Sequence, residues 1–331
     1  MKENRIYWLD NLKWFLILLV VLGHAIQHTY ADFDQNGLFR AIYSFHMPAF
    51  MAVSGYLAWK SKVVRVSPTD YLRRLFRRVR QLVIPYMVWS LAATFVLAGG
   101  LGVADVVSLV AYPERNLWFL WVLFMIFVCF ETVRLLASRC PRYGNSIVVA
   151  SVVVVYGAVS LCHTHKFGLD SMRYYYIFYC LGYFAHHYKK VFLLPKPVVA
   201  ALFLLWCVGA HYWQLGGQPA WAQGFGLVGS ATVYSLFKLI VAVSAILVLL
   251  GLFSQFANNK YVFTPLGQLT LGVYAIHQTV IGVVCNGIRG MMPWAQVAVN
   301  FVVGLLVSLL VIWVLRRCRA TRHFLLGEIS A

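Results

Sequence analysis

The chain has 331 residues, of which 61% are hydrophobic and 11% are charged. A soluble domain has roughly 45–50% apolar and about 25% charged residues, so this composition excludes a water-soluble globule. Apolar stretches recur along the whole length, which excludes a disordered or collagen-like chain. The seven cysteines form no C-x-x-C pair, which disfavours a disulfide framework or a zinc ribbon. Attraction of basic residues to the anionic surface of a membrane explains most of the net charge of +18. We therefore expect no nucleic-acid partner.

About ten stretches are apolar enough over the roughly 20 residues that a spanning helix needs. The sequence therefore predicts an all-α integral membrane protein, a bundle of about ten transmembrane helices that forms a single domain over residues 1–331. In chain order the predicted spans are 12–31, 38–59, 82–101, 117–137, 145–162, 173–188, 196–213, 229–252, 265–285 and 294–315.

Lysine and arginine are distributed unevenly between alternate connections. With the N-terminus inside, all but six of the 28 fall at cytoplasmic ends, where membrane proteins concentrate these residues. Both termini are therefore expected to be cytoplasmic. The first apolar run is too long for a signal peptide, and we expect no soluble domain at either end. The six exceptions are Arg40, Arg115, Lys166, Arg173, Lys238 and Arg289.

The first span carries Lys13 near its start and His24 eleven residues later. Eleven residues of helix rise ~16 Å, which is almost three turns, so both side chains lie on one face. A lysine at a cytoplasmic helix end can simply snorkel to the interface. His24 lies past the middle of a ~30 Å hydrocarbon core, where an ionisable group is expensive and functional by default. The alternative is a buried histidine that a neighbouring helix satisfies.

The second span contains Pro48, which should kink it. His46, Phe50 and Ser54 follow one another at four-residue spacing and share one side of this helix. They offer a substrate an imidazole, a ring and a hydroxyl. For Ser54, the sequence favours the alternative of a close helix crossing at Ser54 and Gly55.

The segment 265–277 places Thr270, Tyr274 and His277 on one helical face. His24, His46 and His277 therefore fall at similar depth, ~18–20 Å from the cytoplasmic side, on three different helices. Imidazoles are good ligands for zinc or iron. No two of these three have the i, i+4 spacing of a helical metal motif, and no carboxylate lies at that depth, so we expect no metal.

The segment 60–81 is a basic cytoplasmic loop with an amphipathic helix. One interpretation is an interfacial helix that binds anionic membrane lipids. The other is a site for a ligand with several phosphates, because guanidinium groups pair bidentately with phosphate oxygens. Its five clustered arginines are Arg73, Arg74, Arg77, Arg78 and Arg80.

These residues, in this order, resemble the membrane acyltransferase family 3, and within it the branch of fucose 4-O-acetylases. Lys13 and His24 are similar to the family's basic-x10-His signature, although arginine is commoner at the first position. The remaining motifs are Phe45-His46-Met47-Pro48 with Ser54-Gly55-Tyr56, a basic stretch with Arg77 and Arg80 that ends in Pro85-Tyr86, Leu117-Trp118-Phe119-Leu120, and Leu271-Gly272-Val273-Tyr274-Ala275-Ile276-His277. The resemblance covers nearly the whole chain.

The resemblance implies a multi-pass O-acyltransferase of the bacterial cytoplasmic (inner) membrane. It would move an acetyl group from cytoplasmic acetyl-CoA to a hydroxyl of a cell-envelope glycan or lipid-linked sugar. The five arginines would then hold the phosphates of acyl-CoA, and His46, Ser54 and Trp118 would contact the acceptor.

In this hypothesis His24 is the general base, with Lys13, Tyr274 and His277 as further catalytic residues. A positioned base contributes about 10²–10⁴-fold to a rate. Tyr274, His277 or His46 would stabilise the oxyanion. A covalent acyl-histidine is the variant mechanism. The alternatives are a non-catalytic transporter or flippase of a lipid-linked sugar, and a structural envelope subunit. The acceptor, the acyl chain and the oligomeric state stay open.

Overall fold

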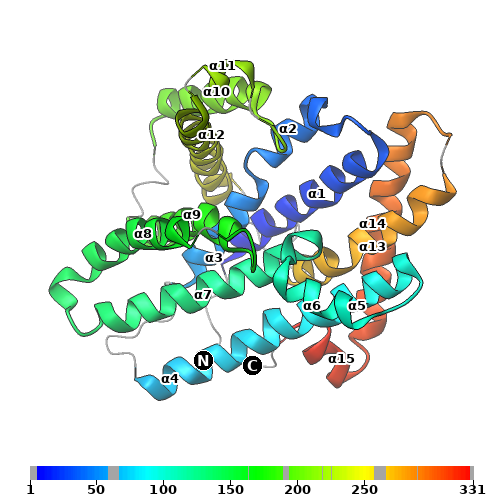
Figure 1. The fold of residues 1–331 in the computed structure, drawn as a ribbon, viewed down its shortest axis with the longest axis horizontal. Helices are drawn as coiled ribbons and strands as arrows, with labels where there is room; N and C mark the ends of the chain where they lie inside the picture. The colour runs from blue at the N-terminus through cyan, green and yellow to red at the C-terminus, as the bar shows by residue number, and fades with distance from the viewer. Residues whose placement is uncertain are drawn as a thin grey trace.

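The computed structural model describes residues 6–58, 67–162, 164–188, 194–217, 219–224, 226–256, 266–288 and 290–328. These residues form helices and no strand (Figure 1). The long helices are α1 (Tyr7–Thr29), α3 (His46–Ala58), α4 (Pro68–Arg78), α5 (Ile84–Ala98), α7 (Trp118–Ala137), α8 (Gly144–Leu161), α9 (Leu169–His187), α10 (Lys196–Tyr212), α12 (Gly226–Phe256), α13 (Thr270–Gly287) and α14 (Pro293–Leu315). The shorter ones are η1 (Phe33–Gln35), α2 (Gly37–Tyr43), η2 (Val79–Val83), α6 (Val103–Ala111), η3 (Pro113–Arg115), η4 (Pro141–Tyr143), α11 (Ala220–Gln223), η6 (Leu266–Gln268) and α15 (Arg319–Phe324).

The predicted all-α class is confirmed, and each predicted span contains one or two helices. In the described ranges, six helical runs are long and apolar enough to cross a membrane, which is consistent with an integral membrane protein. The count of ten spans and the orientation of the termini stay predictions. The six runs are Tyr7–Thr29, Pro68–Ala98, Trp118–Ala137, Pro141–Leu161, Gly229–Phe256 and Pro293–Leu315.

The second predicted span is broken into α2 and α3 at Ser44 and Phe45. Pro48 lacks the N–H that would bond to the Ser44 carbonyl, and its ring would clash with that carbonyl in a continuous helix. The predicted kink is therefore confirmed. It turns α3 so that His46 begins the helix. Residue 59, the last of this predicted span, lies outside the described residues.

The predicted basic loop and the third predicted span join into one helical run. Ser67 caps α4 by accepting a hydrogen bond from the Asp70 N–H at 3.1 Å. Between α4 and α5, η2 is a π-turn, in which the Ile84 N–H bonds to the Val79 carbonyl. It ends two residues before Pro85, which has no N–H to continue an α-helical ladder. Residues 60–66 of the predicted loop, and Arg289 and residue 265 elsewhere, lie outside the described residues.

Helices α3 and α9 cross at the closest approach that a backbone allows. A Cβ on Gly55 would lie 1.9 Å from the Tyr179 carbonyl oxygen, and a Cβ on Gly182 would lie 1.8 Å from that of Ala52. This confirms the close crossing predicted at Ser54 and Gly55. It holds together two of the helices that line the site described next.

Helix α1 runs through the middle of the bundle (Figure 1). Many of its apolar side chains are buried, with Leu16 and Val21 at 0% exposure, whereas Phe15, Leu18, Leu19 and Leu22 are partly exposed. Burial on this scale contributes about 1.5–3 kcal/mol for each large aliphatic side chain. Lys13 and His24 of α1 are thus fixed on a central element of the bundle. Helices α4 and α15 lie at the opposite edge of Figure 1 from α10 and α11.

Candidate active site

A cavity of about 330 Å³, here named the histidine cavity, opens between α1, α3, α7, α9 and α13. Its lining includes His24 of α1, His46 of α3 and Tyr274 of α13. The rings of His24 and His277 lie 5.1 Å apart, centroid to centroid. The structure therefore brings together the three histidines that the sequence placed at similar depth on different helices.

A second cavity, of about 120 Å³ and here named the lysine cavity, lies beside the first. Lys13 lines it, with Phe50 and Ser54 of α3 and Thr270 of α13. Most of its other lining is aliphatic or aromatic. Tyr274 and Met47 line both cavities, so they stand at the junction. Thr270 and Tyr274 both line the lysine cavity, which confirms their predicted shared face, whereas Lys13 and His24 line the two adjoining cavities.

Backbone carbonyls determine which ring nitrogen carries the proton in two of the neutral histidines. His46 Nδ1 lies 2.8 Å from the Ile42 carbonyl oxygen, and His277 Nδ1 lies 2.8 Å from that of Val273. Each neutral ring therefore donates through Nδ1 and carries a bare Nε2, which only accepts. His277 Nε2 and His24 Nδ1 are buried and have no hydrogen-bond partner among the described residues.

The Tyr274 hydroxyl accepts a hydrogen bond from the backbone N–H of Phe119 at 3.3 Å. Its own proton is bonded to none of the described residues. A buried hydroxyl in this state is a donor that needs an acceptor. Since Tyr274 stands at the junction of the two cavities, it can donate to an oxygen placed there.

Lys13 forms an ion pair with Asp10, at 2.7 Å between Nζ and Oδ1. Asp10 is 7% exposed and is packed against Gly267, where a Cβ would come within 2.6 Å of the Asp10 carbonyl oxygen. Lys13 is thus held at the wall of the lysine cavity by a buried carboxylate, not left to snorkel freely. The sequence analysis did not identify Asp10 as this partner, although its i, i+3 spacing from Lys13 was a usable signal.

The five clustered arginines do not share one face. Arg74 lies 3.4 Å from the Glu131 carboxylate, which is 2% exposed and also pairs with Arg134 at 2.8 Å. Arg78 packs over the Phe127 ring at 5.0 Å. The remaining three, Arg73, Arg77 and Arg80, are exposed.

Two exposed apolar side chains accompany the exposed arginines on α4. Leu72 is 49% exposed and Phe76 is 66% exposed. An exposed mixture of arginine and large apolar side chains is typical of a helix at a membrane interface. The arrangement fits anionic lipid and a phosphorylated ligand alike.

The two further residues predicted to contact a substrate both line a cavity. The Ser54 hydroxyl donates to the Phe50 carbonyl at 2.9 Å, so its proton is already bonded within its own helix. The Trp118 ring stacks on Tyr175 at 5.1 Å and forms a wall of the histidine cavity. Trp118 is therefore better placed to contact a ligand than Ser54.

Several cavity residues were missed by the sequence analysis. Gln27 lies beside His24 and accepts a hydrogen bond from the Tyr43 hydroxyl at 3.1 Å. Near the cavity, but not among the residues that line it, His28 follows His24 by one helical turn and is exposed. The i, i+4 spacing of these two histidines was the available signal. Glu114 and Trp213 also line the cavity, but only the tertiary fold brings them there.

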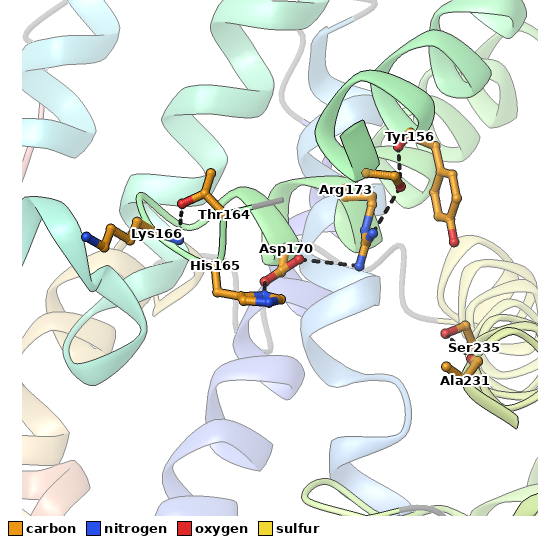
Figure 2. A network of polar contacts seen from close by, with 9 residues as sticks. Tyr156, Thr164, His165, Lys166, Asp170, Arg173, Ala231 and Ser235 are labelled. Atoms are coloured by element: carbon orange, nitrogen blue, oxygen red, sulfur yellow. Dashed lines mark hydrogen bonds and ion pairs between the residues drawn. The ribbon is translucent and has the colours of Figure 1, made fainter. Parts of the chain in front are cut away.

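A polar network fixes the start of α9, which carries Ser171 and Tyr175 to the cavity. Asp170 binds His165 Nδ1 at 2.7 Å and the Arg173 guanidinium at 3.3 Å (Figure 2). Arg173 also donates to the Ser160 hydroxyl of α8 at 3.0 Å.

In the described ranges, no group of three His, Cys, Asp or Glu side chains is arranged to hold a metal ion.

A family model described as an acyltransferase domain matches residues 6–317, which is nearly the whole chain. The chain belongs to this acyltransferase family. The family predicted from the motifs is thereby confirmed, and the site described above lies within the matched residues.

Two curated relatives carry the name nodulation protein NolL. The acyltransferase chain is 36% identical to that of Sinorhizobium fredii over 193 residues, which are 55% of this chain and 49% of the relative. It is 29% identical to that of Mesorhizobium japonicum over 226 residues, 62% of this chain and 57% of the relative. The alignments thus span about half the length of these relatives. No solved structure matches this acyltransferase significantly.

Proposed function

We propose that this protein is a membrane O-acyltransferase that moves an acetyl group from acetyl-CoA to a sugar hydroxyl of an envelope glycan or lipid-linked sugar. The observation that carries the proposal is the junction of two cavities at Tyr274, with Lys13 on one side and His24 on the other. A transferase needs two substrates to meet, and two cavities with a shared wall provide for that. The protein would lie in the bacterial inner membrane with ten spans and both termini cytoplasmic.

The acyl donor would reach the junction through the lysine cavity. The narrow apolar lining of this cavity suits a thin thioester arm, whereas the coenzyme A phosphates need cations outside it. The exposed Arg73, Arg77 and Arg80 would contact those phosphates, although Arg73 lies 3.8 Å from the Asp70 carboxylate and Arg80 packs over the Phe324 ring at 5.8 Å. Arg74 and Arg78, engaged by Glu131 and Phe127, would shape the helix instead.

His24 would act as the general base. It takes the proton of the acceptor hydroxyl as the oxygen attacks the thioester carbonyl carbon. The tetrahedral intermediate then collapses, the carbon–sulfur bond breaks, and the sulfur leaves with the proton from His24 as the free thiol. The products are the sugar ester and coenzyme A, and His24 is neutral again.

The tautomers of His46 and His277 indicate which side chains would stabilise the oxyanion and the protonated His24. Because His46 and His277 present bare Nε2 atoms, neither donates to an oxyanion in the neutral form. Tyr274 has a proton to donate and would stabilise the oxyanion. His277 Nε2, beside His24, would accept the Nδ1–H of the His24 imidazolium and steady it, as the third group of a catalytic triad does.

The experiment measures transfer from radiolabelled acetyl-CoA to envelope glycans in membranes that contain the intact chain, His24→Ala or His211→Ala at matched protein levels. His211 is exposed and serves as the control. Label is expected with the intact chain and with His211→Ala, and is lost in His24→Ala. Label that survives in His24→Ala contradicts the role of His24. Absence of transfer from every acyl-CoA tested, with sugar movement across the membrane retained, would establish the transporter alternative.

A further inference from the structure

We propose that the histidine cavity is the acceptor subsite and that it selects an uncharged sugar unit. Glu114 and Asn116 would bind its hydroxyls, and Trp118, Tyr175 and Trp213 would pack on its ring. This inference rests on the proposed function, since it names the acceptor class for the same site. It assigns roles to Glu114, Asn116, Tyr175 and Trp213.

The charge of the cavity wall disfavours binding of the phosphorylated donor in this space. The chain carries 28 lysines and arginines against 10 acidic residues. Among the described residues that line the histidine cavity, none is a lysine or arginine, and Glu114 is the one carboxylate. Lys238 contacts the Trp213 ring at 4.9 Å from outside the lining and lies near Asp34. A phosphate or a uronic acid placed here would face Glu114 without a cation in the wall to offset it.

The aromatic residues offer flat apolar faces of the kind on which a sugar ring packs. Trp118 and Tyr175 are stacked at 5.1 Å with an angle of 30° between their planes. Trp213 is 4% exposed, and its Nε1–H is buried without an acceptor among the described residues. A buried indole N–H normally finds a partner. A sugar hydroxyl oxygen would supply one, and an apolar ligand would not.

Two hydrogen bonds anchor the segment just before Glu114 and Asn116. The Tyr86 hydroxyl donates to the Leu109 carbonyl at 2.6 Å, and the Phe167 N–H donates to the Ala111 carbonyl at 2.8 Å. Glu114 is exposed and forms no ion pair with a described residue. Its carboxylate is therefore free to accept hydrogen bonds from hydroxyls. Preorganised polar groups of this kind lower the entropic cost of binding.

The test compares a panel of neutral p-nitrophenyl hexosides with the matching uronides, which differ by a carboxylate at C6. Purified protein in lipid nanodiscs is assayed for acetyl transfer and, separately, for equilibrium binding of each glycoside. The wild type is expected to prefer a neutral hexoside by about tenfold in kcat/KM. Glu114→Gln should reduce that preference several-fold by improving use of the uronide, while Asp32→Asn, which removes an exposed carboxylate outside the lining, should leave it unchanged.

A second pair of variants tests the aromatic contact. Trp213→Phe should weaken hexoside binding about tenfold or more, because it removes the hydrogen-bond donor. Trp313→Phe, at a side chain that is 57% exposed on α14, should not. Equal use of hexosides and uronides by the wild type, or an unchanged preference in Glu114→Gln, overturns the subsite. Hexoside binding that depends on Glu114 without any acetyl transfer would leave the subsite standing and overturn the proposed function.

Discussion

Tyr274 and Phe119 meet where the two cavities meet, with the backbone N–H of Phe119 donating to the Tyr274 hydroxyl at 3.3 Å. This bond fixes the phenol oxygen and leaves the phenol proton available. Both residues belong to segments that line the lysine cavity. The arrangement gives the site a positioned neutral donor at the place where the reacting oxygen is expected.

Tyr274→Phe should therefore lower kcat with little change in the KM for acetyl-CoA. Removal of one oxyanion donor costs about 10²–10³-fold in kcat. The measurement is a steady-state titration of acetyl-CoA with the purified protein. Tyr156→Phe, at an exposed tyrosine of α8, is the matched control. A Tyr274→Phe protein within twofold of the wild type would show that the oxyanion is stabilised elsewhere.

The ion pair between Asp10 and Lys13 should behave as one unit. Lys13→Met is expected to reduce kcat/KM for the acyl donor, because the lysine cavity loses its cation. Asp10→Asn should reduce it as well, because Lys13 is then no longer held. Residues in one ion pair are non-additive, so the double variant should be no worse than Lys13→Met alone. Additive losses in this double-mutant cycle would mean that the two residues act separately.

Ser54 offers a test of whether the lysine cavity must stay open. Because its hydroxyl bonds to the Phe50 carbonyl, Ser54→Ala should keep most of the activity. Ser54→Leu adds volume to a cavity of about 120 Å³ and should abolish transfer. Ser235→Leu, at an exposed position of α12, controls for the substitution itself. Full activity in Ser54→Leu would place the acyl arm on another route.

The arginines of α4 should separate into two groups. Arg74→Gln leaves the buried Glu131 with only Arg134, and should lower the free energy of unfolding by about 1–3 kcal/mol. Arg77→Gln should instead raise the KM for acetyl-CoA, more strongly at low salt, without changing stability. Thermal unfolding in detergent and donor titrations distinguish the two. A stability loss in Arg77→Gln with an unchanged KM would assign it a structural role.

The crossing of α3 and α9 should be intolerant of any side chain. Gly55→Ala or Gly182→Ala brings a Cβ into the partner backbone and should destabilise the protein by about 1–3 kcal/mol or more. Gly157→Ala is the control, since a Cβ there meets nothing within 4 Å. Because alanine has a higher helix propensity than glycine, Gly157→Ala should cause no loss of stability. Unfolding midpoints that are equal for all three variants would contradict the crossing.

Most of the helices could be predicted because a long apolar run in a membrane has few alternatives to a helix. The break at Ser44 followed from Pro48, and the shared faces of α1, α3 and α13 followed from helical periodicity. The short helices α6, α11 and α15 were not predicted. They lie in connections, where local sequence gives no strong period.

The sequence predicted only those site residues that lie within the apolar runs of predicted helices. His24, His46, Tyr274 and His277 stood out because polar groups in apolar runs are conspicuous. Glu114 and Trp213 lie in connections, where such residues are common, so only the tertiary structure shows that they line the cavity. The sequence also does not show that Arg74 lies beside the buried Glu131, which separates it from the exposed Arg73, Arg77 and Arg80.

The most direct test of the account is a single-turnover acetyl transfer in lipid nanodiscs with purified wild type, His24→Gln and His211→Gln. The account predicts that the wild type and His211→Gln release one coenzyme A thiol for each sugar ester formed. The unfolding midpoint of His24→Gln is measured first, to establish that the variant is folded like the wild type. Its rate of acetyl transfer should then be lower by about 10²-fold or more. A His24→Gln protein that transfers the acetyl group at the wild-type rate would contradict the central claim.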